Sequence, residues 1–140
     1  MKKVVIVEDN EMTLDIYKLI FKKYIRNVDI ECIQEAEKAI ERVTKNQFDL
    51  LIADFNLGHP TINGMDIARL AYPLGKPIMI VSGHKFKPRM NLYFRYWDMF
   101  SRVTFLGKPF KCKDMVDCVN LLLDEDPVPL NIMFNKIIHH

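Results

Sequence analysis

Five side chains capable of metal or phosphoryl chemistry stand directly after short apolar runs of the sequence. They are Glu8, Asp9, Asp54, Ser82 and Lys108. Clustered carboxylates repel one another, and a hard divalent cation relieves that repulsion; magnesium suits a site with few protein carboxylates. A carboxylate can also act as a nucleophile toward phosphorus, and a lysine or a serine hydroxyl can hold phosphoryl oxygens. These residue types favour magnesium-assisted phosphoryl transfer to a carboxylate.

Each of these residues also has a simpler explanation. Glu8 and Asp9 could cap the helix that follows them. Ser82 could be an ordinary turn residue, and Lys108 could be a solvated surface charge. Taken singly, the simpler explanations are favoured. Their placement after four different apolar runs favours a shared site, provided that those runs are strands ending at one edge of a sheet.

Short β-rich apolar runs alternate with segments of helical periodicity. The expected strands are Val4–Val7, Val28–Ile33, Phe48–Ala53, Ile78–Val81 and Val103–Leu106. Helices are indicated by Met12, Ile16, Leu19, Ile20 and Tyr24; by Ala36, Ala39, Ile40 and Val43; by Ile67, Leu70 and Ala71, ending near Tyr72-Pro73; by Pro88 to Ser101; and by Met115, Val116, Val119, Leu122 and Leu123. This β-α alternation, repeated five times, predicts an α/β fold with a parallel sheet covered on both faces.

Composition narrows the class of protein. The chain has 140 residues, 49% of them apolar and 27% charged, as expected of one soluble globular domain. No apolar run approaches the ~20 residues that span a bilayer, so we expect no membrane insertion and a cytoplasmic location. The cysteines, Cys32, Cys112 and Cys118, lack a Cys-x-x-Cys pair, and we expect reduced thiols.

The net charge of +2 is unevenly distributed, because basic residues outnumber acidic ones between Lys85 and Lys113. Such a region can steer acidic partners, although a solvated face is the favoured interpretation. No recognition-helix motif accompanies it, so we expect no specific binding to DNA.

The ordered motifs resemble those of a known family. Val7-Glu8-Asp9-Asn10, Asp54 after an apolar strand, Ser82-Gly83 and Lys108-Pro109-Phe110 are similar to the receiver domains of two-component response regulators. The resemblance covers roughly residues 2 to 123. It implies a flavodoxin-like (βα)5 three-layer sandwich whose five-stranded parallel sheet has the order 2-1-3-4-5.

The resemblance also implies roles. Asp54 matches the phosphoacceptor, and Glu8 and Asp9 match the acidic pair that holds Mg²⁺ together with Asp54 and the backbone carbonyl of Asn56. Lys108 matches the lysine that contacts the phosphoryl group. Ser82 matches the hydroxyl that moves toward that group, and Phe105 matches the aromatic side chain that rotates with it. The donor would be a phosphohistidine on a sensor histidine kinase or a histidine phosphotransfer protein.

Three departures from the family pattern stand out. The loop after Asp54, from Phe55 to Gly64, is longer than usual and lacks the common Met-Pro. The region of the fourth helix is also longer and lacks the usual Gly-Ala before the fifth strand. No DNA-binding or enzymatic domain follows, so we expect a single-domain regulator: a receiver domain over residues 1–124 and a C-terminal appendix, not a separate domain, over residues 125–140.

Output is then expected through contact with another protein. Leu92, Tyr96 and Met99 form a second apolar stripe on the expected fourth helix, beyond the one needed to cover a sheet. We expect this stripe to contact an output protein or a second copy of the chain, through the face made by the fourth helix, fifth strand and fifth helix. The alternative is that the apolar appendix covers it.

Two other functions compete with a phosphorylated switch that is not an enzyme beyond slow self-dephosphorylation. One is a degenerate receiver that binds partners without phosphorylation. The less favoured one is a Mg²⁺-dependent phosphatase acting through an aspartyl phosphate. Haloacid-dehalogenase-like phosphatases carry Asp-x-Asp after their first strand, whereas here Asp54-Phe55-Asn56 follows the third.

Overall fold

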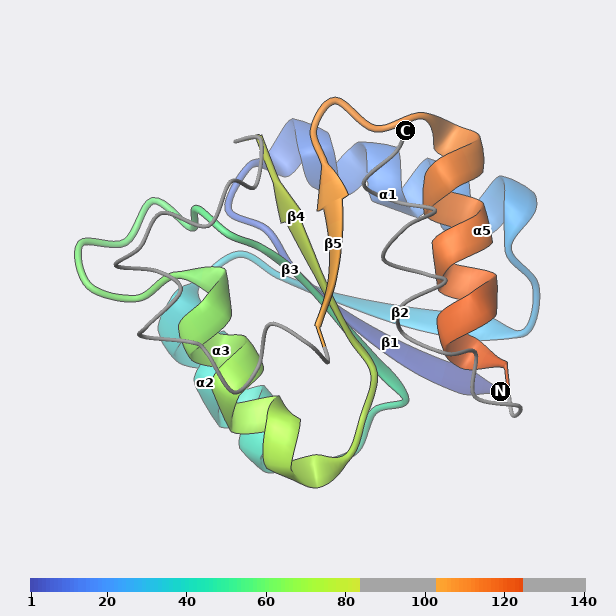
Figure 1. The fold of residues 1–140 in the computed structure, drawn as a ribbon. Helices are drawn as coiled ribbons and strands as arrows, with labels where there is room; N and C mark the ends of the chain where they lie inside the picture. The colour runs from blue at the N-terminus through green and yellow to red at the C-terminus, as the bar shows by residue number, and fades with distance from the viewer. Residues whose placement is uncertain (84–102, 125–140) are drawn as a thin grey trace.

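The computed structural model describes residues 1–83 and 103–124 of the chain. Strands and helices alternate from the start (Figure 1). In chain order they are β1 (Lys2–Val7), α1 (Glu11–Tyr24), β2 (Val28–Ile33), α2 (Ala36–Thr44), β3 (Leu50–Asp54), α3 (Gly64–Ala71), the 3-10 turn η1 (Tyr72–Leu74), β4 (Ile78–Ser82), β5 (Thr104–Gly107) and α5 (Cys112–Leu123). The helix expected from Pro88 to Ser101, with Leu92, Tyr96 and Met99, and the appendix of residues 125–140 lie outside the described residues.

The five strands form one parallel sheet in the order β2-β1-β3-β4-β5, which confirms the predicted fold class. The register aligns the carboxyl ends of the central strands. Val7 pairs with Ala53, Asp54 with Val81, and Ser82 with Gly107. The residues that end or follow these strands therefore gather at one edge of the sheet.

Helices cover the sheet on both faces, as Figure 1 shows. β3 and β4 are buried along their whole length, as expected of parallel strands enclosed by helices. Alternate residues point to opposite faces. Val5 and Leu51 contribute to the core shared with α2 and α3, whereas Ile6 and Ile52 contribute to the core shared with α1 and α5.

The first helix forms as predicted, but most of the residues that indicated it lie on its solvent side. Met12, Ile16, Leu19 and Tyr24 are exposed, and only Ile20 of that set is buried. The buried residues of α1 are Leu14, Tyr17, Ile20 and Phe21. Both sets have helical spacing, so periodicity alone could not show which one faces the sheet.

The helix that follows β3 ends where its sequence indicated. α3 stops at Ala71, and Pro73 then lies in the 3-10 turn η1, where its missing N–H is tolerated. Gly75 closes this turn with a φ of +71°, a left-handed conformation that favours glycine. Among the described residues, no helix combines the length and the apolar character needed to cross a membrane.

Candidate phosphoryl and metal site

The predicted site residues come from four strands and meet at the carboxyl edge of the sheet. Glu8 and Asp9 follow β1, Asp54 is the last residue of β3, Ser82 is the last residue of β4, and Lys108 follows β5. The backbone ties the last two together, because the N–H of Lys108 donates to the carbonyl of Ser82 at 2.7 Å. The fold thus brings all five residues to the same edge.

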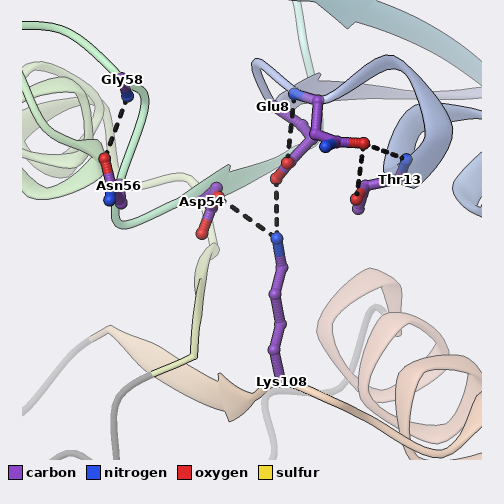
Figure 2. Close-up of polar contacts among 7 residues, drawn as sticks. Glu8, Thr13, Asp54, Asn56, Gly58 and Lys108 are labelled. Atoms are coloured by element: carbon purple, nitrogen blue, oxygen red, sulfur yellow. Dashed lines mark hydrogen bonds and ion pairs between the residues drawn. The ribbon is translucent and has the colours of Figure 1, made fainter.

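Lys108 joins two of the carboxylates directly. Its Nζ lies 3.1 Å from Glu8 Oε2 and 3.2 Å from Asp54 Oδ2. Figure 2 shows the lysine side chain extending from the end of β5 toward both acids. Glu8 is 1% exposed and Asp54 is 8% exposed, whereas 24% of the Lys108 side chain is exposed. A nearly buried pair of acids therefore shares one cation at the surface.

One lysine does not balance the negative charge. Burial raises the pKa of Glu8 to about 7, and the neighbouring Asp54 carboxylate adds to this effect against the opposing influence of Lys108. Burial works against the charged form of Lys108, yet its hydrogen bonds and charge interactions with Glu8 and Asp54 outweigh it and raise the Lys108 pKa. The site is therefore electrostatically suited to a further cation.

A third carboxylate completes a set of metal-ligand type. Oxygen atoms of Glu8, Asp9 and Asp54 all lie within 4.8 Å of one another, and Asp9 is exposed to solvent. Carboxylate oxygens with one side open to water are what Mg²⁺ requires, because this ion keeps several of its waters. The residues present fit the ion that the sequence predicted.

Helix capping does not explain the acidic pair. Asn10 is the N-cap of α1, and its Oδ1 accepts from the backbone N–H of Thr13 at 3.0 Å (Figure 2). Glu8 instead accepts from the N–H of Asn10 at 3.3 Å with its Oε1 and contacts Lys108 with its Oε2. The simpler explanation for Glu8 and Asp9 is therefore wrong.

The other predicted residues lie close by. Ser82 is 3% exposed, one position beyond the residue that pairs with Asp54. Phe105 is 5% exposed, pairs with Ile80 and packs in the core on the α2 and α3 side. Asn56 lies in the loop after β3, where its Oδ1 accepts from the N–H of Gly58 at 3.0 Å. The roles assigned to these three residues stay predictions.

Two glycines were not singled out from the sequence as part of the site. A Cβ atom on Gly64 would lie 2.1 Å from the carbonyl oxygen of Asp54, so only glycine lets α3 begin this close to β3. A Cβ atom on Gly58 would lie 2.7 Å from Asp9 Oδ2. One sequence signal could have located Gly64. Asn63 and Asp66 have the spacing of a capping box, and this capping box fixes the start of α3 at Gly64.

The chain matches the family model of the response regulator receiver domain over residues 4–120. No protein with a curated description matches its sequence significantly. A CheY-like response regulator receiver domain protein of Methanospirillum hungatei is similar in structure, with a TM-score of 0.73 and 21% identity over 89% of this chain and 95% of that one. The chemotaxis protein CheY4 of Vibrio cholerae gives 0.69 and 17% over 88% and 99%.

A third similar structure is the receiver domain of a sensor histidine kinase from Pseudomonas aeruginosa. It has a TM-score of 0.69 and 14% identity over 87% of this chain and 97% of that one, and it holds a magnesium ion coordinated in the active site cleft. At these identities, the similar structures demonstrate a shared fold.

Proposed function

Because residues 4–120 match its family model, the chain belongs to the response regulator receiver domain family, and we propose that it is a signalling switch that accepts a phosphoryl group on Asp54. The observation that carries the proposal is the position of Lys108, whose Nζ lies 3.1 Å from Glu8 and 3.2 Å from Asp54. A cation placed between an acidic metal-type cluster and a nucleophile candidate suits phosphoryl transfer, in which positioning and charge stabilisation do most of the catalysis.

In the proposed reaction, a carboxylate oxygen of Asp54 attacks the phosphorus of a phosphohistidine on a sensor histidine kinase or phosphotransfer protein. The P–O bond forms as the P–N bond breaks, and the electron pair of the broken bond stays on the imidazole nitrogen. Lys108, already within reach of Asp54, donates to a phosphoryl oxygen. Ser82, one residue beyond the partner of Asp54, donates to another.

Glu8, Asp9, Asp54 and the backbone carbonyl of Asn56 would hold Mg²⁺. When bound, the ion supplies positive charge that offsets the negative charge of the phosphoryl group. The three clustered carboxylates and the raised pKa of Glu8 support this assignment, because both reflect negative charge that Lys108 alone leaves uncompensated.

The switch would act by moving Ser82 toward the phosphoryl group and letting Phe105 rotate behind it. Both side chains are nearly buried and lie on neighbouring strands, which supports a coupled movement. Output would follow through Leu92, Tyr96 and Met99, as a changed contact with another protein or a second copy. Residues 1–124 would form the receiver domain and residues 125–140 its appendix, with no enzymatic turnover beyond slow self-dephosphorylation.

The experiment that separates the competing functions is labelling by a small acyl phosphate, with and without Mg²⁺. A switch takes up one phosphoryl group per chain only when Mg²⁺ is present. A degenerate receiver takes up none in either condition. A phosphatase instead hydrolyses a phosphate ester with steady turnover, so continuous release of phosphate from such an ester contradicts the proposal.

A further inference from the structure

The loop between β3 and α3, residues 55–63, is organised around His59. The Nδ1 atom of its ring accepts from the backbone N–H of Thr61 at 3.1 Å and from that of Ile62 at 3.0 Å. Asparagine and aspartate side chains make this kind of bond to the backbone two residues on in turns. Because Nδ1 accepts, the bonding pattern assigns the ring proton to Nε2.

That Nε2 atom ties the loop to a neighbouring helix. It lies 2.5 Å from Oε1 of Glu37, in the first turn of α2. The pKa of Glu37 is lowered, first by a hydrogen bond from the Glu37 backbone N–H and then by the hydrogen bond with His59. The Glu37 carboxylate therefore accepts the hydrogen bond of His59 as an anion. The His59 side chain is 21% exposed, so the ring is largely enclosed where the loop meets α2.

The same loop reaches the acidic cluster on its other side. Gly58 directly precedes His59 and has a φ of +64°, and its backbone lies so close to Asp9 that a Cβ atom there would be 2.7 Å from Oδ2. The N–H of Gly58 also donates to Asn56 Oδ1 at 3.0 Å (Figure 2). A shift of His59 would therefore move the Gly58 backbone, which leaves no room for a Cβ atom beside Asp9 and which donates to the side chain of Asn56. Asp9 and the backbone carbonyl of Asn56 are two of the proposed metal ligands.

We propose that His59 is a positioning residue, which Glu37 holds in place and which fixes the loop against Asp9 and Asn56 so that the site binds Mg²⁺ more tightly. The inference rests on the proposed function, because it concerns the same site. It requires no contact between His59 and the metal or the phosphoryl group. His59, which makes the hydrogen bond to Glu37, belongs to the loop that is longer than the corresponding loop of the family pattern.

The test compares Mg²⁺ binding by calorimetry across four variants of the full chain. His59→Ala removes both the turn and the tie to α2. His59→Asn keeps an acceptor for the turn but loses the hydrogen bond to Glu37. Glu37→Ala loses that bond and the interaction of Glu37 with its own backbone N–H, but it leaves the turn around His59 intact. Glu41→Ala is the matched control, an exposed acid one helical turn further along α2. Labelling rates with an acyl phosphate are measured over a range of Mg²⁺ concentrations.

We expect His59→Ala to weaken Mg²⁺ binding about tenfold, the lower end of the range for residues that orient metal ligands. Its labelling rate at saturating Mg²⁺ should stay within about twofold of the native chain, because only binding is affected. His59→Asn and Glu37→Ala should fall between the native chain and His59→Ala, and Glu41→Ala should match the native chain.

Unchanged Mg²⁺ affinity in His59→Ala overturns the inference, and so does a loss of rate that saturating Mg²⁺ fails to restore. If His59→Ala does not fold, the Mg²⁺ affinity of Glu37→Ala is compared with that of Glu41→Ala instead. Equal affinities of these two variants also overturn the inference. A native chain that neither binds Mg²⁺ nor takes up a phosphoryl group contradicts the proposed function itself. The two failures are thus distinguished by the native chain.

Discussion

Charge and burial conflict at Glu8, where the neighbouring Lys108 only partly offsets the effect of burial. Glu8 is almost fully buried, yet it lies beside a second buried acid, and both depend on one lysine. Removing one member of a buried ion pair generally destabilises a protein, because the remaining charge keeps its desolvation penalty. The site should therefore be a weak point of the metal-free fold.

Lys108→Met should make this visible. We expect the metal-free unfolding free energy at pH 8 to fall by roughly 2–3 kcal/mol, below the largest values for broken buried pairs because part of the lysine side chain is exposed. Urea unfolding measures this, with Lys111→Met as the control at a nearby exposed lysine. Equal stabilities of the two variants would show that Lys108 does not compensate the acids.

The pH dependence of stability should carry the signature of Glu8. Its folded pKa is raised from the ordinary 4.5 to about 7, so the folded chain holds a proton that the unfolded chain releases. Unfolding free energy contributed by this group should therefore decline as the pH rises from about 4.5 to about 7 and level off above that. The raised pKa of Lys108 acts only at alkaline pH, where stability is lost as the pH passes its folded value.

Urea unfolding without metal, between pH 4.5 and 8, tests this in the native chain and in Glu8→Gln. The variant should show a flatter pH profile, because its amide does not titrate. Added Mg²⁺ should stabilise the native chain most above pH 7, where Glu8 is ionised. Parallel profiles for the two chains would assign the pH dependence to other groups.

At the scale of elements, the site depends on how closely α3 approaches β3. The N–H of Gly64 donates to the carbonyl of Phe55 at 2.9 Å, and the capping box of Asn63 and Asp66 fixes the first turn of the helix. The first residue of α3, Gly64, therefore packs against the backbone of Asp54, and this contact leaves no room for a side chain at position 64.

Gly64→Ala should push α3 away from Asp54. We expect the unfolding free energy to fall by about 1–3 kcal/mol, as for overpacking in a core. Phosphorylation by an acyl phosphate should also be slower. Gly107→Ala is the control, since a Cβ atom there would meet no atom of the described residues within 4 Å. If both variants unfold at the same urea concentration, the close approach does not restrict the site.

The proposed output acts through the expected fourth helix, β5 and α5. If Ser82 and Phe105 respond to phosphorylation, hydrogen exchange across residues 86–110 should change when a phosphoryl mimic is added. Association measured by sedimentation, or capture of a partner protein, should change with it, and Tyr96→Ala should weaken that association. A mimic that alters neither exchange nor association contradicts the switch, even if Asp54 is phosphorylated.

Across the whole chain, the alternation of apolar runs with helical segments predicted the fold, and the residues that follow those runs then indicated the edge where they meet. The ends of these strands could be predicted because the apolar runs stop at Asp54 and at Gly107-Lys108. The sequence did not reveal which face of α1 packs against the sheet. Exposed Met12 and buried Leu14 each belong to a set of apolar residues with helical spacing. The hydrogen bond between Glu37 and His59 could not be predicted either. It joins residues 22 positions apart, and His59 lies in a loop with no periodic pattern.

We expect Asp54 to be the sole phosphoacceptor of the chain, and the intact mass after treatment with an acyl phosphate measures this. With Mg²⁺, the native chain and the control Asp29→Asn, an exposed acid on β2, should each gain one phosphoryl group. Asp54→Asn should gain none, and neither should the native chain without Mg²⁺. A phosphoryl group that persists in Asp54→Asn, or that reaches the native chain equally without Mg²⁺, would contradict Mg²⁺-dependent phosphorylation of Asp54.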